Sequence, residues 1–166
     1  MIGSIAMEVR PMLTTFVDFF NLLLAALLVG TIFGTWLTAS PAGLGVSDYM
    51  VVQQQHIRAL NVFMPLLGGA TILFSIASAF LSRADGTRLM LLVVVVLSFI
   101  IAGLITRFLN QPINAVVMTW KPDAPPADWM QLRDEWWRWH LVRLTFGLLG
   151  LCLLIATMLR RHIIGE

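Results

Sequence analysis

Two segments of the sequence combine histidine with arginine, amide and tryptophan side chains, which are residue types that can move a proton and hold a charged oxygen. Gln53–Asn61 carries His56, and Arg133–Arg143 carries His140. An imidazole accepts or releases a proton near neutral pH, and a guanidinium stabilises a developing negative charge. Both segments border long apolar runs, where a polar group without a partner is costly. They are therefore candidate sites for ligand binding or proton transfer.

The second segment places five such side chains on one face of a helix. Because an α-helix turns about 100° per residue, positions 133, 136, 137, 140 and 143 fall within about 120° of arc. The face carries Arg133, Trp136, Trp137, His140 and Arg143. Three structural alternatives stay open: an interfacial belt of tryptophans, an Arg143 that reaches lipid headgroups, and a His140 that makes only a structural hydrogen bond.

The first segment is less simple to place. On an ideal helix Gln54, Arg58 and Asn61 share a face, whereas His56 points roughly the opposite way and is also compatible with a solvated helix start. The two faces of a straight helix cannot both line one narrow cavity. Pro65 lacks the amide hydrogen that the carbonyl of Asn61 would accept, so the sequence predicts a kink there.

A third group of polar residues follows the third apolar run. Asn110 and Asn114 flank Pro112, where an asparagine can also serve only to satisfy interrupted backbone. Side chains from three separate segments are thus expected at one membrane depth. The sequence contains no P-loop, no GxSxG, no HExxH and no CxxC motif.

These residues must be positioned by apolar helices. The chain of 166 residues is 58% hydrophobic and only 12% charged, against about 25% charged in soluble domains. A membrane span needs about 20 apolar residues, and hydrocarbon offers the backbone no hydrogen-bond partners, so spans are helical. The sequence predicts an all-α transmembrane four-helix bundle, forming one domain, with spans at about 12–37, 50–81, 89–109 and 140–159.

The connections between the spans differ in length and charge. The third link, Asn110–Trp139, is the only long one, and a helix from about Trp129, with Asp128 as its capping residue, is expected to run directly into the fourth span. Cytoplasmic loops carry an excess of arginine and lysine. Arg10 stands at the N-terminus, Arg83 and Arg88 in the second loop and Arg160 and Arg161 at the C-terminus, whereas the first loop has no arginine or lysine. This pattern predicts cytoplasmic termini, an outward third link and location in a bacterial inner membrane.

Two features of the first span predict contacts elsewhere. Asp18 is the only carboxylate within a predicted span, and we expect it to pair with a basic residue of the second loop or to reach water. Ala26, Gly30 and Gly34 recur at a spacing of four, which allows close helix approach. A homo-oligomer through the Gly30/Gly34 face is one expected consequence. A net charge of +2 without a basic block argues against nucleic-acid binding.

Specific motifs also resemble a known family. They are Asn110-Gln-Pro-Ile-Asn114, Trp129, Arg133-x-x-Trp136-x-x-x-His140-x-x-Arg143, and a longer segment running through Gly34-Thr-Trp36, Pro41, Tyr49, Gln54-Gln55-His56, Asn61 and Pro65. Together they cover most of the chain and look like the anthrone-oxygenase-like membrane family (DUF1772). The resemblance implies a small four-helix membrane protein. Fungal members oxidise anthrones to anthraquinones with dioxygen, whereas most bacterial members have no assigned role.

The resemblance leads to an expected function and site. The expected substrate is a lipophilic aromatic of the anthrone kind, with His140 or His56 as base and Arg133 or Arg143 facing the enolate-like oxygen. The expected substrate-binding residues are Asn61, Asn110, Asn114, Trp36, Trp136 and Trp137. Dioxygen is the expected co-substrate without a further cofactor, and a metal or a bis-histidine haem is the less favoured option. The alternative is a non-enzymatic membrane subunit or a lipid- or quinone-binding protein, and a small transporter ranks third.

Overall fold

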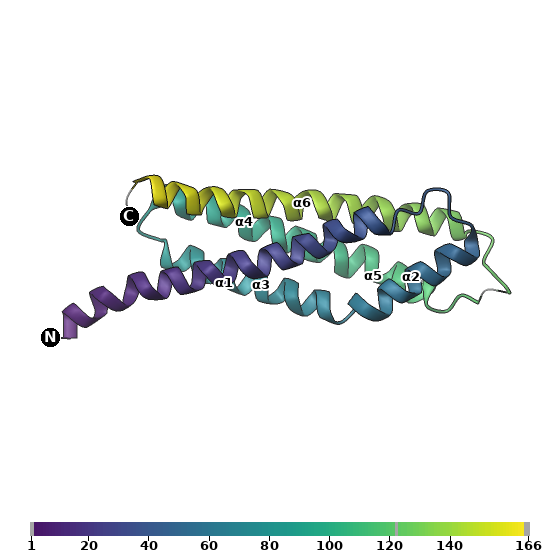
Figure 1. The fold of residues 1–166 in the computed structure, drawn as a ribbon, viewed down its shortest axis with the longest axis horizontal. Coiled ribbons are helices and arrows are strands. Elements are labelled where there is room, and N and C mark those ends of the chain that lie inside the picture. Colours follow the sequence, from purple (N-terminus) through teal and green to yellow (C-terminus); the bar gives the residue numbers. More distant parts are fainter. Residues whose placement is uncertain (1, 122, 165–166) are drawn as a thin grey trace.

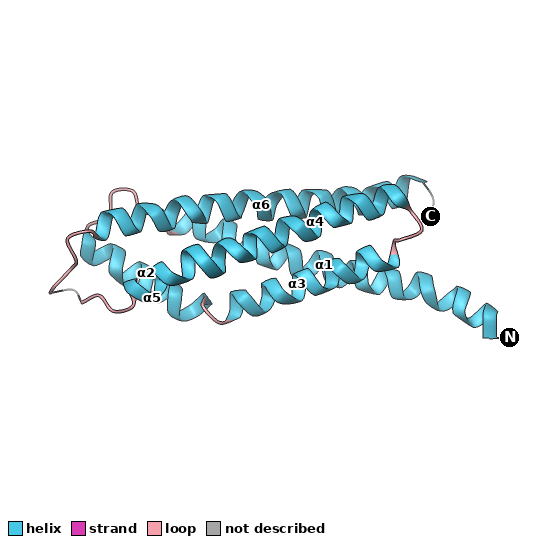
Figure 2. Ribbon diagram, turned by 180° about the vertical axis from the view of Figure 1, so that it is seen from behind, coloured by secondary structure: helices cyan, strands magenta, loops and turns pink. Residues whose placement is uncertain are grey.

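The computed structural model describes residues 2–121 and 123–164, and in this part every regular element is a helix (Figure 2). The elements are α1 Ile2–Thr38, α2 Val46–Leu60, α3 Phe63–Leu81, α4 Gly86–Ile105, the wide π-helical turn η1 Thr106–Asn110, α5 Gln111–Val117 and α6 Trp129–Ile164. The all-α prediction is confirmed.

Four long helices form the bundle. The stretches long and apolar enough to cross a membrane are Pro11–Thr38, Phe63–Leu81, Gly86–Val117 and Trp129–Arg160, as the hydropathy pattern predicts. Helix α4 packs on α3 and α6, and α1 packs on the same two helices, which closes a four-helix ring. In Figure 1 both chain ends lie at one end of this bundle. Helix α3 has 19 residues, so it is about 28 Å long and matches the hydrocarbon thickness of about 30 Å.

The second apolar segment is divided into two helices. The sequence predicts one kinked helix over 50–81, whereas the structure ends α2 at Leu60 and begins α3 at Phe63. The physical reason is Pro65, which cannot donate to the carbonyl of Asn61 and is tolerated in the first turn of a helix. Helix α2 is consequently free to leave the bundle axis.

The third apolar segment remains helical beyond its predicted end at about residue 109. The backbone amide of Gln111 donates to the carbonyl of Thr106, which is the wider spacing of a π-turn. This turn absorbs Pro112, and α5 continues to Val117. The third connection therefore shortens to residues 118–128, and α6 begins at Trp129 and continues without a break into its span, as predicted.

Helix α2, helix α5 and the first turns of α6 form a cap over one end of the bundle, with its own apolar core. That core contains Tyr49, Met50, Ile57, Ile113, Val117, Trp120 and Trp136. The amide of Gln54 donates to the carbonyls of Val117 at 3.0 Å and Trp120 at 3.2 Å, which ties α2 to the end of α5. Burial raises the pKa of Tyr49, so its phenol stays protonated.

A buried polar network lies at the other end of the bundle. Arg88 at the start of α4 donates to Asp18 at 2.5 Å, and Ser78 of α3 donates to the second carboxylate oxygen. One turn along α1, Asn21 accepts from Ser75 at 2.8 Å. The predicted pairing of Asp18 with a basic residue of the second loop is confirmed.

Loss of this ion pair is expected to destabilise the bundle. Asp18→Ala leaves the guanidinium of Arg88 buried without its carboxylate, and breaking a buried pair costs about 3–5 kcal/mol. Thermal unfolding in detergent measures the effect. Asp48→Ala is the control, because Asp48 is exposed in the first turn of α2. Equal midpoints for the two variants would show that the pair contributes no stability.

Candidate functional site

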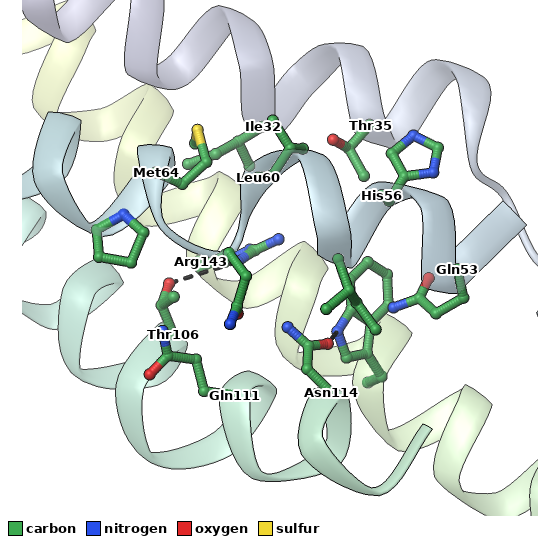
Figure 3. Close-up of a pocket in the computed structure, with 14 residues that line it drawn as sticks. Ile32, Thr35, Gln53, His56, Leu60, Met64, Thr106, Gln111, Asn114 and Arg143 are labelled. Carbon is green, nitrogen blue, oxygen red and sulfur yellow. Dashed lines mark hydrogen bonds between the residues drawn. The ribbon is translucent and has the colours of Figure 1, made fainter. Parts of the chain in front are cut away.

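The centre of the candidate site is Arg143 on α6. Its guanidinium donates to Nδ1 of His140, at 2.8 Å from Nη2 and 3.3 Å from Nε. It also donates from Nη1 to the hydroxyl of Thr106 at 3.4 Å (Figure 3). Among the described residues Arg143 forms no ion pair, so its guanidinium is hydrogen-bonded to neutral acceptors and its charge has no counter-charge.

His140 accepts hydrogen bonds from Arg143 and is itself fixed between two aromatic rings. Its ring is stacked between Trp136 and Trp137, with centroid distances of 5.2 and 5.3 Å and interplanar angles of 13° in both cases. The side chain is fully buried, and its Nε2 has no hydrogen-bond partner in the described part of the chain. Because Nδ1 accepts from Arg143, the neutral ring carries its proton on Nε2.

Asn110 and Asn114, which flank Pro112, both form hydrogen bonds with Trp136. The amide of Asn110 donates to the backbone carbonyl of Trp136 at 3.0 Å, and Asn114 accepts from the indole nitrogen at 2.8 Å. Their spacing across the π-turn brings both side chains onto one face toward α6. The Asn-x-Pro-x-Asn motif therefore fixes the aromatic ring on which His140 stacks.

A small cavity of about 50 Å³, with both polar and apolar walls, lies beside Arg143. Its polar lining comes from five elements and the α2–α3 turn, and consists of Thr35, Gln53, His56, Asn61, Thr106, Gln111, Asn114, Trp136 and Arg143. Figure 3 shows the labelled residues around this space. Because one water needs at least about 10–15 Å³, the cavity has room for a few small molecules only.

His56 lines the small cavity with a free ring nitrogen. Its Nδ1 lies 2.9 Å from the carbonyl of Val52, which can only accept, so Nδ1 carries the proton of the neutral ring. The lone pair of Nε2 is then available as a base. His56 and Asn61 line the same cavity, although Asn61 keeps helical backbone angles and its amide still donates to the carbonyl of Ile57. The cavity therefore extends around the end of α2 and reaches both side chains.

Gln53 is a further polar group on this cavity. Its side chain is 2% exposed, and its amide nitrogen has no hydrogen-bond partner in the described part of the chain. A buried amide donor without a partner costs about 1–3 kcal/mol. Gln53 can therefore donate to a molecule in the small cavity.

A larger apolar groove of about 560 Å³ joins the small cavity. It lies between α3 and α4, and helix α1 contributes Leu28 and Ile32 to its lining. The two spaces share seven residues, which are Ile32, Asn61, Met64, Pro65, Thr106, Gln111 and Arg143. A volume of several hundred Å³ is typical of small-molecule sites, so the groove has room for a polycyclic ligand that the small cavity lacks.

The structure places two of the predicted site residues, Arg133 and Trp36, away from both spaces. Arg133 pairs with Asp134 at 2.8 Å and lies over the ring of Trp129 at 5.0 Å. Trp36 is 40% exposed and packs on Phe33. Five predicted residues line the small cavity: His56, Asn61, Asn114, Trp136 and Arg143. His140, Asn110 and Trp137 support it without lining it.

Sequence reasoning missed three residues of the site: Thr106, Gln111 and Gln53. Thr106 resembles many threonines of apolar helices, and only the π-turn brings it toward Arg143. Gln111 stands inside the Asn-x-Pro-x-Asn motif, which was a usable signal. Gln53 was placed beside His56 on the helix, but its burial depends on the cap.

The arrangement bears on the metal and haem options. In the described part of the chain no three His, Cys, Asp or Glu side chains come together as a metal-binding group. A bis-histidine haem would need His56 and His140 to face one space, and only His56 lines a cavity. The residues present do not fit a haem in this conformation.

Comparison with known protein families matches residues 55–153 to the anthrone oxygenase family. Comparisons with curated proteins and with solved structures find no match. The matched region runs from the end of α2 to the middle of α6 and contains His56, Asn61, Thr106, His140 and Arg143. It covers more than half of the chain. The chain therefore belongs to the anthrone oxygenase family.

Proposed function

We propose that the protein is a membrane-embedded oxygenase that uses dioxygen to oxidise a lipophilic, anthrone-like aromatic ketone. The observation that carries the proposal is a base and an oxyanion donor on one cavity. His56 presents a free Nε2 and Arg143 presents a guanidinium without a carboxylate partner, both on the small cavity. A groove of polycycle size adjoins this cavity and shares Arg143 with it. The family supports the reaction class.

The first step is proton removal from the benzylic carbon. Nε2 of His56 accepts the proton, and the electron pair of the broken C–H bond delocalises onto the ring carbonyl oxygen. Arg143 faces that oxygen as it becomes negative, and oxyanion donors stabilise such charge selectively in the transition state. The product of the step is an enolate with an imidazolium beside it.

The second step uses dioxygen. The enolate carbon forms a C–O bond with dioxygen, which is reduced to the peroxide level, and a proton from His56 completes a hydroperoxide. Loss of the remaining C–H proton then breaks the O–O bond and releases water, so that the carbon becomes a second ketone. One substrate and one dioxygen give one quinone and one water. Gln53 and Asn114 line the small cavity where the peroxide oxygens would lie.

Size assigns different roles to the two spaces. At about 50 Å³ the small cavity fits dioxygen or water, whereas the groove of about 560 Å³ fits the ring system. His140 contacts neither, so it acts as a positioning residue that holds Arg143. Trp136 is an aromatic wall of the small cavity, fixed by Asn110 and Asn114.

Oxygen uptake tests the proposal directly. Purified protein in lipid nanodiscs is given anthrone and ¹⁸O₂, and protein-free nanodiscs correct for spontaneous oxidation. We expect catalysed uptake with one labelled oxygen in the quinone and one in water. Absence of catalysed uptake together with saturable ligand binding would instead favour the alternative function, a lipid- or quinone-binding membrane protein.

We also propose that the cap faces the outside of a bacterial inner membrane and that both termini are cytoplasmic. The basic residues near the α3–α4 turn support this orientation. In a Cys152→Ala background, Thr119→Cys in the 118–128 connection should react with an impermeant maleimide on intact cells. Ala84→Cys in the α3–α4 turn should react only after lysis. The reverse pattern would refute the orientation.

A further inference from the structure

The groove is built from glycines on two neighbouring helices. Gly68 and Gly69 of α3 and Gly103 of α4 line it, and an added Cβ at Gly69 would meet no atom within 4 Å. At Gly68 and Gly103 the nearest side-chain atom would lie at 3.9 Å. Because these positions carry no side chain, α3 and α4 do not pack closely there, and the groove is an open slot between them.

The slot opens toward the lipid. Val62 and Leu66, which line it, are 72% and 69% exposed. Gly69 lies six residues after the start of α3, which is about 9 Å along the helix axis. Because α3 just spans the hydrocarbon, this part of the slot lies within the acyl-chain region. An apolar ligand dissolved in the bilayer can reach it without crossing water.

The inner end of the slot is polar and carries uncompensated positive charge. Arg143, Arg107, Thr106 and Gln111 line that end, and no Asp or Glu is among the described residues that line either space. Arg143 is half-buried, and a cation partly removed from water without a counter-charge favours a ligand with a negative or strongly polarised oxygen. An acyl chain alone would not supply that oxygen.

We infer that the glycine slot between α3 and α4 is a lateral binding site, through which a flat fused-ring aromatic enters from the bilayer with its ring carbonyl directed to Arg143. This inference rests on the proposed function for the identity of the ligand. The rings lie along Gly68, Gly69 and Gly103, and the reactive carbon reaches the shared wall of the small cavity. Glycine at these positions therefore determines which ring systems are accepted.

Filling the slot tests the inference. Anthraquinone has the ring system of the expected product and does not consume dioxygen, so its binding is separable from turnover. It is titrated into nanodiscs that contain wild type, Gly69→Phe, Gly103→Phe or Leu73→Phe, and quenching of tryptophan fluorescence reports binding. Leu73 is the matched control, since it lies one turn from Gly69, is 68% exposed and lines neither space. Thermal unfolding checks that each variant is folded.

We expect both glycine variants to weaken saturable binding by about tenfold or more, since steric changes of this size discriminate strongly in apolar sites, whereas Leu73→Phe stays near wild type. Equal affinity in all four proteins would overturn the inference, as would wild-type quenching no greater than partition into lipid. Oxygen uptake separates the two proposals. If binding depends on the slot but no oxygen is consumed, the oxygenase proposal is wrong and the slot proposal stands. If oxygen is consumed and Gly69→Phe does not change the rate, the slot proposal is wrong and the oxygenase proposal stands.

Discussion

Replacing Arg143 by alanine is expected to reduce kcat/KM for an anthrone by about 10²–10³-fold, the usual effect of removing one oxyanion donor. The guanidinium is the charged group shared by the small cavity and the inner end of the slot, close to where the enolate oxygen forms. It also has no carboxylate partner among the described residues, so its charge is available to the substrate. Initial rates of quinone formation in nanodiscs measure the effect.

Two further variants make this test specific. Arg143→Lys keeps a charge but cannot donate to Nδ1 of His140 through two nitrogens, so we expect an intermediate rate. Arg138→Gln is the matched control, because Arg138 is exposed on the same helix and lies over Trp139. If Arg143→Ala and Arg138→Gln had the same modest effect, Arg143 would have no role in the chemistry.

Replacing His56 by alanine is expected to lower kcat by about 10²–10⁴-fold, the range for loss of a general base. The variant also leaves space on the small cavity where an imidazole ring stood, so added imidazole should restore part of the rate. KM should change little, because His56 lines the small cavity and not the slot that holds the rings.

His140→Gln is the contrasting variant, since it tests a positioning role. An amide can still accept from Arg143, so we expect a smaller loss of rate than in His56→Ala. Added imidazole should not restore it, because His140 is fully buried between two tryptophans. If added imidazole restored the rate of His140→Gln but not that of His56→Ala, His140 would be the base and His56 the positioning residue.

The fold was largely predictable because hydropathy reports directly on burial in lipid. Four apolar runs and a helix starting at Trp129 are features of composition and proline placement, and both appear in the structure. The cost of an unpaired charge in hydrocarbon led to two alternatives for Asp18, a basic partner from the second loop or contact with water. The structure shows the first, with Arg88 as the partner. Such requirements are local and can be read residue by residue.

The arrangement of the candidate site was less predictable because it depends on two interruptions of helical geometry. The separation of α2 from α3 lets the small cavity extend around the end of α2 to both His56 and Asn61, and the π-turn at Thr106–Asn110 turns Thr106 toward Arg143. A sequence with a proline predicts an irregularity, but whether it becomes a kink, a break or a wide turn depends on packing. The helical stripe likewise grouped Arg133 with Arg143 because angular position does not specify depth.

Hydrogen exchange at the benzylic carbon under nitrogen tests the central claim most directly, since it isolates proton removal from every step that needs dioxygen. Anthrone is incubated in D₂O with nanodiscs, and deuterium at that carbon is followed by NMR. We predict exchange well above the protein-free rate for wild type and near that rate for both His56→Ala and Arg143→Ala. Exchange that is equally fast in both variants and wild type would contradict a site built on His56 and Arg143.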